Sequence, residues 1–163
     1  MVAIKIIRTK NPVALAIHAA MWLWAILRGL PTTKCYNHAE VHVFDMVSGA
    51  IGGGVETRLW KEYKAEFEGC YFRFINYPLR LTDDQLQNGI KYLKKVEGRK
   101  YEFENFLWHI IKIITGKWKG DRNAKQLYCY EHVIRFLNAT GKYNISPYLN
   151  PYEFKVWADK NLV

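Results

Sequence analysis

The sequence predicts an α+β domain in which a small antiparallel sheet packs against helices. One observation is the segment NHAEVHVFD at residues 37–45, where polar and apolar side chains alternate strictly, as in a half-buried strand. The other is the order of the patterns: an early helix, three or more strands, and then helices only. Strands that are grouped in this way, and do not alternate with helices, are typical of α+β proteins.

The composition is that of a globular protein. The chain has 163 residues, of which 50% are hydrophobic and 24% are charged, so we expect one folded domain over residues 1–163. The formal net charge of +9 favours an acidic partner such as a nucleic acid, an acidic polymer or an anionic membrane surface. The basic residues are dispersed, which argues against a site for a specific nucleic acid.

The cysteines indicate a reducing environment. The chain contains three, Cys35, Cys70 and Cys129, an odd number at unrelated spacings. They form neither a disulfide framework nor, with histidines, a zinc-ligand pattern. We therefore expect a cytoplasmic protein with free thiols.

The N-terminal segment predicts a strand followed by an apolar helix. Residues 2–7 (VAIKII) form the strand candidate, and Pro12 suits the first turn of a helix that runs to about Leu27 and is stopped by Gly29. Basic residues before this apolar run give it a superficial likeness to a signal peptide. The run is short for a membrane span and is interrupted by His18, so we expect a buried helix.

The middle of the chain predicts a three-stranded meander. The alternating strand at residues 37–45 is followed by a turn signal, VSGA, at residues 47–50. The glycine-rich segment IGGGVETRLW at residues 51–60 then reads as the return strand, and GCYFRFINYPL at residues 69–79 as the third strand.

The next segment predicts two helices. Thr82 and the residues after it form a capping box, and Gly98 suits the end of the helix that follows. Residues 101–115 (YEFENFLWHIIKIIT) predict another helix, with a large apolar face.

The C-terminal part predicts one more helix, followed by a tail that packs on the surface. Residues 126–140 (QLYCYEHVIRFLNAT) have an apolar face with helical spacing, and Gly141 is a suitable terminator. The segment rich in proline and tyrosine at residues 144–154 is expected to pack across the surface.

Cys129 lies at the start of this last predicted helix. The unpaired N–H groups of a first helical turn favour a thiolate, and cysteines in such positions reach pKa values of about 3.5–7.5, against about 8.5 for a free thiol. A buried structural cysteine would explain the position equally simply. A nucleophile needs, in addition, a base and a group that orients the base.

Three of the five histidines are poor candidates for that base. His18 and His109 lie in apolar helical patterns, where packing explains them. His132 follows Cys129 by three residues, so its side chain projects beside the cysteine and not across a cleft from it.

The strand at residues 37–45 offers a better base. Its alternation directs His38, Glu40 and His42 to one face, and a row of polar groups on one face of a small sheet is unusual. His38 is the candidate base on this face.

The order of these motifs resembles a known family. A histidine at a strand start (YNHAEVHV) precedes a hairpin partner (GGGVETRLW), a Gly-x-x-Tyr segment (GRKYEFENFL) and a cysteine at a helix start (LYCYEHVIRFL). This order is similar to that of the circularly permuted NlpC-type papain-like hydrolases, which include the YaeF/YiiX-like and lecithin:retinol acyltransferase-like proteins. The resemblance covers Ile4 to about Gly141.

The resemblance implies a permuted papain-like fold and a cysteine hydrolase. It assigns the nucleophile to Cys129 and the base to His38. Two neighbouring positions differ from the family, because Tyr130 replaces a small hydroxyl residue and Asn37 replaces a serine.

A third polar residue should orient the base. If the hairpin turns near residues 47–48, Glu56 falls opposite His38, where a carboxylate would hold the imidazole in one tautomer. Glu56 is therefore the first choice, followed by His42 and then Glu40.

The resemblance leaves the substrate open among a peptide, a cell-wall peptide crosslink and a lipid acyl bond, and it implies no metal or organic cofactor. The oligomeric state is open as well. The alternative is a basic binding module of papain-like shape without turnover, which would hold nucleic acid or an anionic surface.

Overall fold

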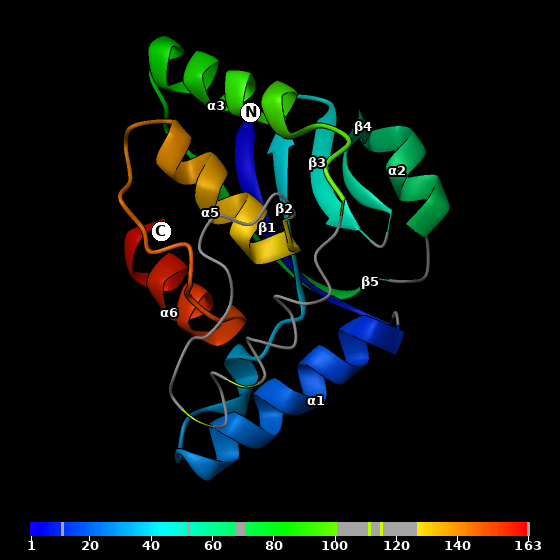
Figure 1. Ribbon diagram of the computed structural model, residues 1–163, viewed down its shortest axis with the longest axis vertical. Coiled ribbons are helices and arrows are strands. Elements are labelled where there is room, and N and C mark those ends of the chain that lie inside the picture. Colours follow the sequence, from blue (N-terminus) through cyan, green and yellow to red (C-terminus); the bar gives the residue numbers. More distant parts are fainter. Residues whose placement is uncertain are drawn as a thin grey trace.

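A five-stranded antiparallel sheet organises the protein (Figure 1). The computed structural model describes residues 1–10, 12–51, 53–67, 71–100, 111, 115 and 127–162. The strands, in the spatial order β4-β3-β2-β1-β5, place β1 next to the centre. Their bounds are β1 Val2–Thr9, β2 His38–Val43, β3 Met46–Ile51, β4 Gly54–Leu59 and β5 Tyr71–Leu79.

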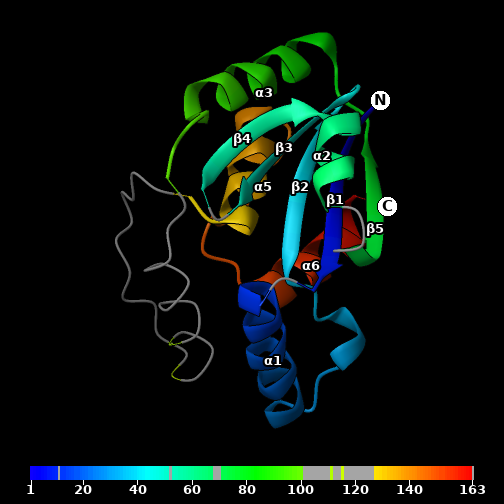
Figure 2. The ribbon, with the colours of Figure 1, turned by 90° about the vertical axis from the view of Figure 1, so that its right-hand side faces the viewer.

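Helices lie on both faces of this sheet (Figure 2). One face is apolar: Val41 of β2 belongs to the same buried core as Val133 of α5 and Val96 of α3. The other face is polar in β2 and is met by α2, whose Tyr63 reaches Glu40. The helical bounds are α1 Pro12–Leu27, η1 Thr32–Lys34 (a 3-10 turn), α2 Trp60–Phe67, α3 Asp83–Val96, α5 Cys129–Ala139 and α6 Pro151–Asn161.

The α+β class and several predicted elements are confirmed. The first strand, the helix Pro12–Leu27 and the alternating strand form as predicted. Thr82 caps α3 through the predicted capping box, in which its side chain accepts from the backbone N–H of Gln85. Gly98 and Gly141 follow their helices with φ of 74° and 76°, the left-handed conformation that glycine adopts readily. The helix predicted at residues 101–115 lies largely outside the described residues.

The predicted meander is wrong in two respects. The first hairpin turns at Phe44 and Asp45, so residues 47–50, predicted as a turn, lie inside β3. The return strand that pairs with β2 is therefore β3, and most of the glycine-rich segment 51–60 forms the next strand, β4. Two-residue hairpin turns favour residues with positive φ, which are usually glycine or asparagine. Here Phe44 takes that position with φ 57°, and an aromatic residue in the sequence does not indicate such a turn. The predicted third strand, β5, pairs with β1 and not with the return strand.

Two helices were not predicted. The short α2 begins directly at the end of β4, where Trp60 reads as the last residue of a strand. The tail forms α6, and its start carries a recognisable signal: Asn150 and Glu153 make a capping box, with Pro151 in the first turn.

The predicted N-terminal helix is buried on one side only. Met21 and Ala25 of α1 are fully buried, whereas Leu23 and Leu27 on another side are exposed. None of the described helices is both long enough and apolar enough to cross a bilayer.

Gly54 lies where β4 passes close to the backbone that follows α3. Its φ is 141°, and a Cβ atom there would overlap the carbonyl oxygen of Arg99, which accepts a hydrogen bond from the Val55 N–H at 2.7 Å. Gly54→Ala should lower the free energy of unfolding by about 2–3 kcal/mol or more, because it adds a backbone clash to backbone strain.

Gly141→Ala is the matched control. Gly141 also has positive φ, but no atom lies within 4 Å of its added Cβ, so only about 1 kcal/mol of strain is expected. Urea denaturation of both variants measures the difference, and equal losses would contradict the close approach.

Candidate active site

Cys129 is the first residue of α5, as the sequence predicts. The residue before it, Tyr128, is extended, with φ −103° and ψ 166°, and its carbonyl oxygen accepts the first helical hydrogen bond from His132 at 2.9 Å. The N–H groups of a first helical turn have no acceptor within the helix, and the side chain of Tyr128 does not cap them. The buried Cys129 thiol therefore lies at the positive end of the α5 dipole.

His38 meets Cys129 from the sheet. It is the first residue of β2, and its imidazole lies near enough to the side chain of Cys129 to interact with it, although the two residues are far apart in the sequence. The Nε2 atom of His38 lies 3.2 Å from Oε1 of Glu40. Since Nε2 is engaged there, Nδ1 is the ring nitrogen left for the sulfur.

The backbone around His38 is held by β1. The N–H of Asn37 donates to the carbonyl of Ile7 at 3.2 Å, and the Asn37 side chain accepts from and donates to the backbone of Thr9 at 2.8 and 3.1 Å. On the other side, the pairing of β2 with β3 ends at Glu40 and Gly49. His38 thus lies beyond the last pair of that ladder, and its backbone is paired with Ile7 of β1.

Glu40 is a fully buried carboxylate with several donors around it. Oε1 accepts from the Tyr63 hydroxyl at 2.5 Å and faces His38, while Oε2 lies 3.1 Å from Nε2 of His42. Burial alone would raise the pKa of Glu40, but the hydrogen bonds from His38, His42 and Tyr63 and the charge of His38 hold it well below its usual range. Glu40 is therefore ionised.

The ionised Glu40 changes the protonation of His38. Burial would lower the pKa of His38, but its interactions with Cys129 and with the carboxylate of Glu40 raise it to about 10. His38 is therefore protonated at neutral pH, with one N–H directed to the carboxylate and the other available to the sulfur.

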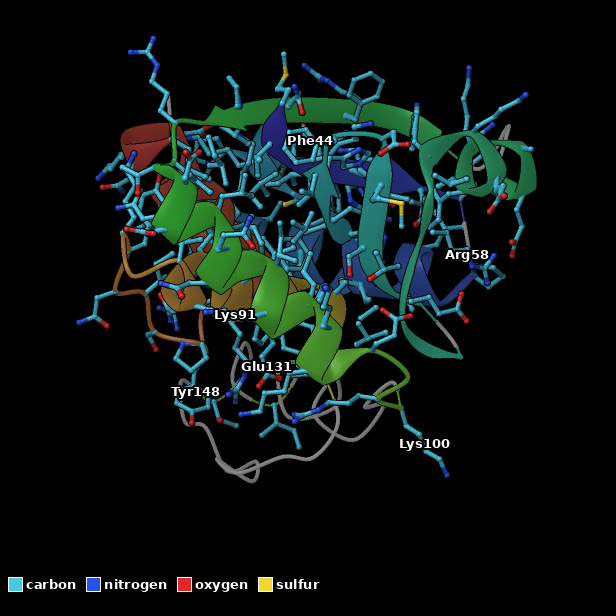
Figure 3. All side chains as sticks on the ribbon, turned by 90° about the horizontal axis from the view of Figure 1, so that it is seen from above. Phe44, Arg58, Lys91, Lys100, Glu131 and Tyr148 are labelled. Atoms are coloured by element: carbon cyan, nitrogen blue, oxygen red, sulfur yellow. The ribbon has the colours of Figure 1, made fainter. Side chains whose placement is uncertain are left out.

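The prediction that Glu56 orients His38 is wrong. Glu56 lies on β4 opposite Gly49 of β3, so β3 separates it from β2. Its carboxylate pairs with Arg58, which projects outward from the edge of the sheet (Figure 3). The misplaced hairpin turn is the cause, since a turn near residues 47–48 would have made β4 the neighbour of β2. Glu40, the third choice from sequence, makes the contact.

His42 acts on the carboxylate from its other side. Its ring binds Oε2 of Glu40 and meets Trp60 of α2 edge-on, with ring centroids 5.0 Å apart. His42 thus contacts the group that orients His38.

His132 belongs to the core and not to the base. Its Nε2 lies 3.1 Å from the Ser48 hydroxyl and its Nδ1 3.5 Å from the Tyr92 hydroxyl, against whose ring it also stacks. Burial, with a smaller contribution from the charge of His38, lowers the pKa of His132 to about 3. It is a neutral hydrogen-bonding residue that joins α5 to β3. His109 lies outside the described residues.

Two residues of the site escaped the sequence analysis. Tyr63 was missed because α2 was not predicted. Gly49 was assigned to a turn, whereas it lies in β3 beside the polar cluster: a Cβ there would lie 3.6 Å from Glu40 Cγ, 3.7 Å from the Tyr63 hydroxyl and 3.9 Å from His38 Nε2. These are ordinary van der Waals distances, so Gly49 lies directly against the polar cluster, and a glycine inside a strand was the available signal.

Within the described part of the chain, no group of three or more His, Cys, Asp or Glu side chains is arranged to hold a metal ion.

No protein-family model matches this chain, and no curated protein matches its sequence. Function must therefore be inferred from the side chains that meet at the start of α5.

The pKa values of His38 and His132 should be shifted in opposite directions from that of an ordinary histidine. Because the pKa of His38 is raised from 6.5 to about 10, its contribution to stability is present below pH 6.5 and is lost as the pH rises toward 10. Imidazole ¹⁵N NMR should find His38 doubly protonated at about pH 8 and His132 still neutral at about pH 5.

Glu40→Gln should lower the pKa of His38 by removing its negative partner. Glu56→Gln, a matched change on the same face of the sheet, should leave that pKa where it is. Equal effects of the two changes would contradict the assignment of Glu40 as the partner of His38.

Proposed function

We propose that the protein is a cysteine hydrolase with a permuted papain-like fold. The observation that carries the proposal is the proximity of Cys129, at the start of α5, and His38, at the start of β2, two residues that only the tertiary structure brings together. A thiol at a helix start, an imidazole on a strand and a carboxylate behind the imidazole are the parts that thiol-based acyl transfer requires.

The chain order supports the permuted form of the fold. His38 begins the second strand and Cys129 begins a helix near the C-terminus, so the base precedes the nucleophile. This is the order of the permuted NlpC-type papain-like hydrolases that the sequence resembles. The α5 helix packs on the sheet that carries His38, in agreement with such a fold.

The reaction begins with Cys129 and a protonated His38. The imidazolium stabilises negative charge on the sulfur, which attacks the carbonyl carbon of an amide or ester. The carbonyl oxygen becomes an oxyanion, and the N–H groups at the start of α5, which have no helical acceptor, are placed to donate to it. His38 then protonates the leaving amine or alcohol as the carbon–nitrogen or carbon–oxygen bond breaks, which leaves a thioester on Cys129.

Water completes the cycle. The neutral His38 accepts a proton from the water molecule that attacks the thioester, and the carboxylic acid product leaves as the sulfur is released. Glu40 has a positioning role in both halves: its charge stabilises the imidazolium, and its bond to Nε2 directs Nδ1 to the sulfur.

The substrate classes that suit this chemistry are peptides, cell-wall peptides and lipid acyl groups. A free nucleophilic thiol suits a reducing compartment, and we infer a cytoplasmic location on that ground.

Turnover tests the proposal directly. With panels of p-nitroanilide amides and p-nitrophenyl acyl esters, Cys129→Ala and His38→Ala should each lower kcat/KM by more than about 10³-fold. Glu40→Gln should lower it by about 10²-fold or more because the imidazole loses its orienting partner. Glu56→Gln should retain nearly full activity.

Binding without turnover is the outcome that would overturn the hydrolase. If no ester or amide is cleaved, while binding to nucleic acid or heparin is steeply salt-dependent and survives Cys129→Ala, the protein is a basic binding module.

Thiol reactivity gives an independent test. Iodoacetamide at neutral pH should modify Cys129 before Cys35, because burial raises the pKa of the Cys35 thiol whereas Cys129 faces an imidazolium. His38→Ala should slow the labelling of Cys129 and leave that of Cys35 unchanged, as read by peptide mass spectrometry. Faster labelling of Cys35, or no effect of His38→Ala, would exclude the thiolate–imidazolium pair. Cys70 lies outside the described residues.

A further inference from the structure

The helix α1 has two apolar faces: within the described part of the chain, one packs against the protein and the other is exposed. Its inner face buries Met21 and Trp24, and the Trp24 ring meets Tyr152 of α6 with centroids 5.2 Å apart. The segment Pro12–Leu27 contains no charged residue, and His18 is its most polar side chain. A surface helix of an ordinary globular protein would carry polar residues on its outer side.

The outer side of α1 is instead a continuous apolar stripe, which we call the outer α1 face. Its large side chains are 45–77% exposed and recur at helical spacing, so they lie along one side of the helix. They are Leu15, Trp22, Leu23, Ile26 and Leu27. Exposed apolar patches of this kind mark a surface that contacts a partner or a membrane.

The chain segment that contains α1 carries charge of a single sign. The first acidic residue of the chain is Glu40, so the 39 residues before it carry only basic charges. Two of these residues, Lys10 and Arg28, are exposed and stand just before and just after α1. An apolar stripe between basic residues complements a lipid surface with anionic headgroups, where each basic side chain is attracted by about 1 kcal/mol.

The same charges disfavour a second copy of the chain as the occupant. Pairing two outer α1 faces would bring together the exposed basic residues that flank the helix, Lys10 and Arg28, from both copies, whereas Lys34 is already paired with Asp159 at 3.4 Å. Like charges that are brought close together oppose association.

We propose that the outer α1 face docks onto anionic lipid bilayers. The inner face stays packed on the protein, so α1 lies in the plane of the membrane, with Leu23 and Leu27 among the acyl chains and Trp22 at the headgroup boundary. Lys10 and Arg28 contact the headgroups from the two ends of the helix.

Docking places the Cys129–His38 pair at the membrane end of the molecule. Thr9, at the end of β1 shortly before α1, is hydrogen-bonded to Asn37, the neighbour of His38. Figure 1 shows α1 below the end of the sheet at which β1 ends and β2 begins. The docking surface itself does not depend on turnover and can be tested without a substrate.

Co-sedimentation with sucrose-loaded vesicles tests the proposal. The wild-type protein should bind vesicles of phosphatidylcholine and phosphatidylserine, bind vesicles of phosphatidylcholine alone more weakly, and lose affinity for the anionic vesicles as salt rises. The double variant Leu23→Ser/Leu27→Ser should bind the anionic vesicles at least about tenfold more weakly, since it removes two apolar side chains from the contact. Lys10→Gln/Arg28→Gln should reduce the difference between the two vesicle types.

Phe44→Ser is the matched control. Phe44 is an apolar side chain with 65% exposure in the β2–β3 turn, at the end of β2 away from His38 and α1. This change should leave vesicle binding unaltered. Circular dichroism should show folded protein for all variants, because every substituted side chain is exposed.

Three outcomes would overturn the proposal. The first is a wild-type protein that stays in the supernatant with both vesicle types. The second is vesicle binding that is equally strong in the Leu23→Ser/Leu27→Ser variant. The third is a wild-type dimer in analytical ultracentrifugation that this variant converts to a monomer, which would assign the outer α1 face to contact between copies.

Discussion

The buried carboxylate of Glu40 is the constraint on which the arrangement of the site depends. An ionised group with no solvent exposure costs several kcal/mol unless hydrogen bonds and opposite charge replace its water. Here Tyr63, His42 and His38 supply them, from α2 and from two positions of β2 itself. The need to satisfy this carboxylate fixes the side chain of His38 and draws α2 against the polar face of the sheet.

The two faces of β2 make different contacts, one apolar and one polar. Val41 and its apolar neighbours bind the sheet to α5 and so place Cys129, while the alternate residues build the polar cluster around Glu40. These faces would be isolated from each other in a fully paired strand. They are linked at His38, because the pairing of β2 with β3 ends at Glu40 and Gly49. The imidazole of His38 can therefore interact with both the carboxylate of Glu40 and the thiol of Cys129.

The N-terminal segment links this site to the outside of the molecule. The strand β1 holds the start of β2 through Asn37, and the chain then turns within a few residues into α1, whose outer face is apolar and flanked by basic charge. A hydrolase docked through α1 would meet substrates at a lipid surface with its nucleophile at the same end of the sheet.

The sequence by itself determined the features that depend on neighbours along the chain. The alternation of β2, the capping box at Thr82 and the position of Cys129 at a helix start are local patterns, and each is present in the structure. The residue that orients His38 could not be predicted in this way, because the neighbours of a strand depend on the positions of its turns. Phe44 carries no turn signal, so the register was misjudged, and only the tertiary structure excluded Glu56 and brought Glu40 and Tyr63 to His38.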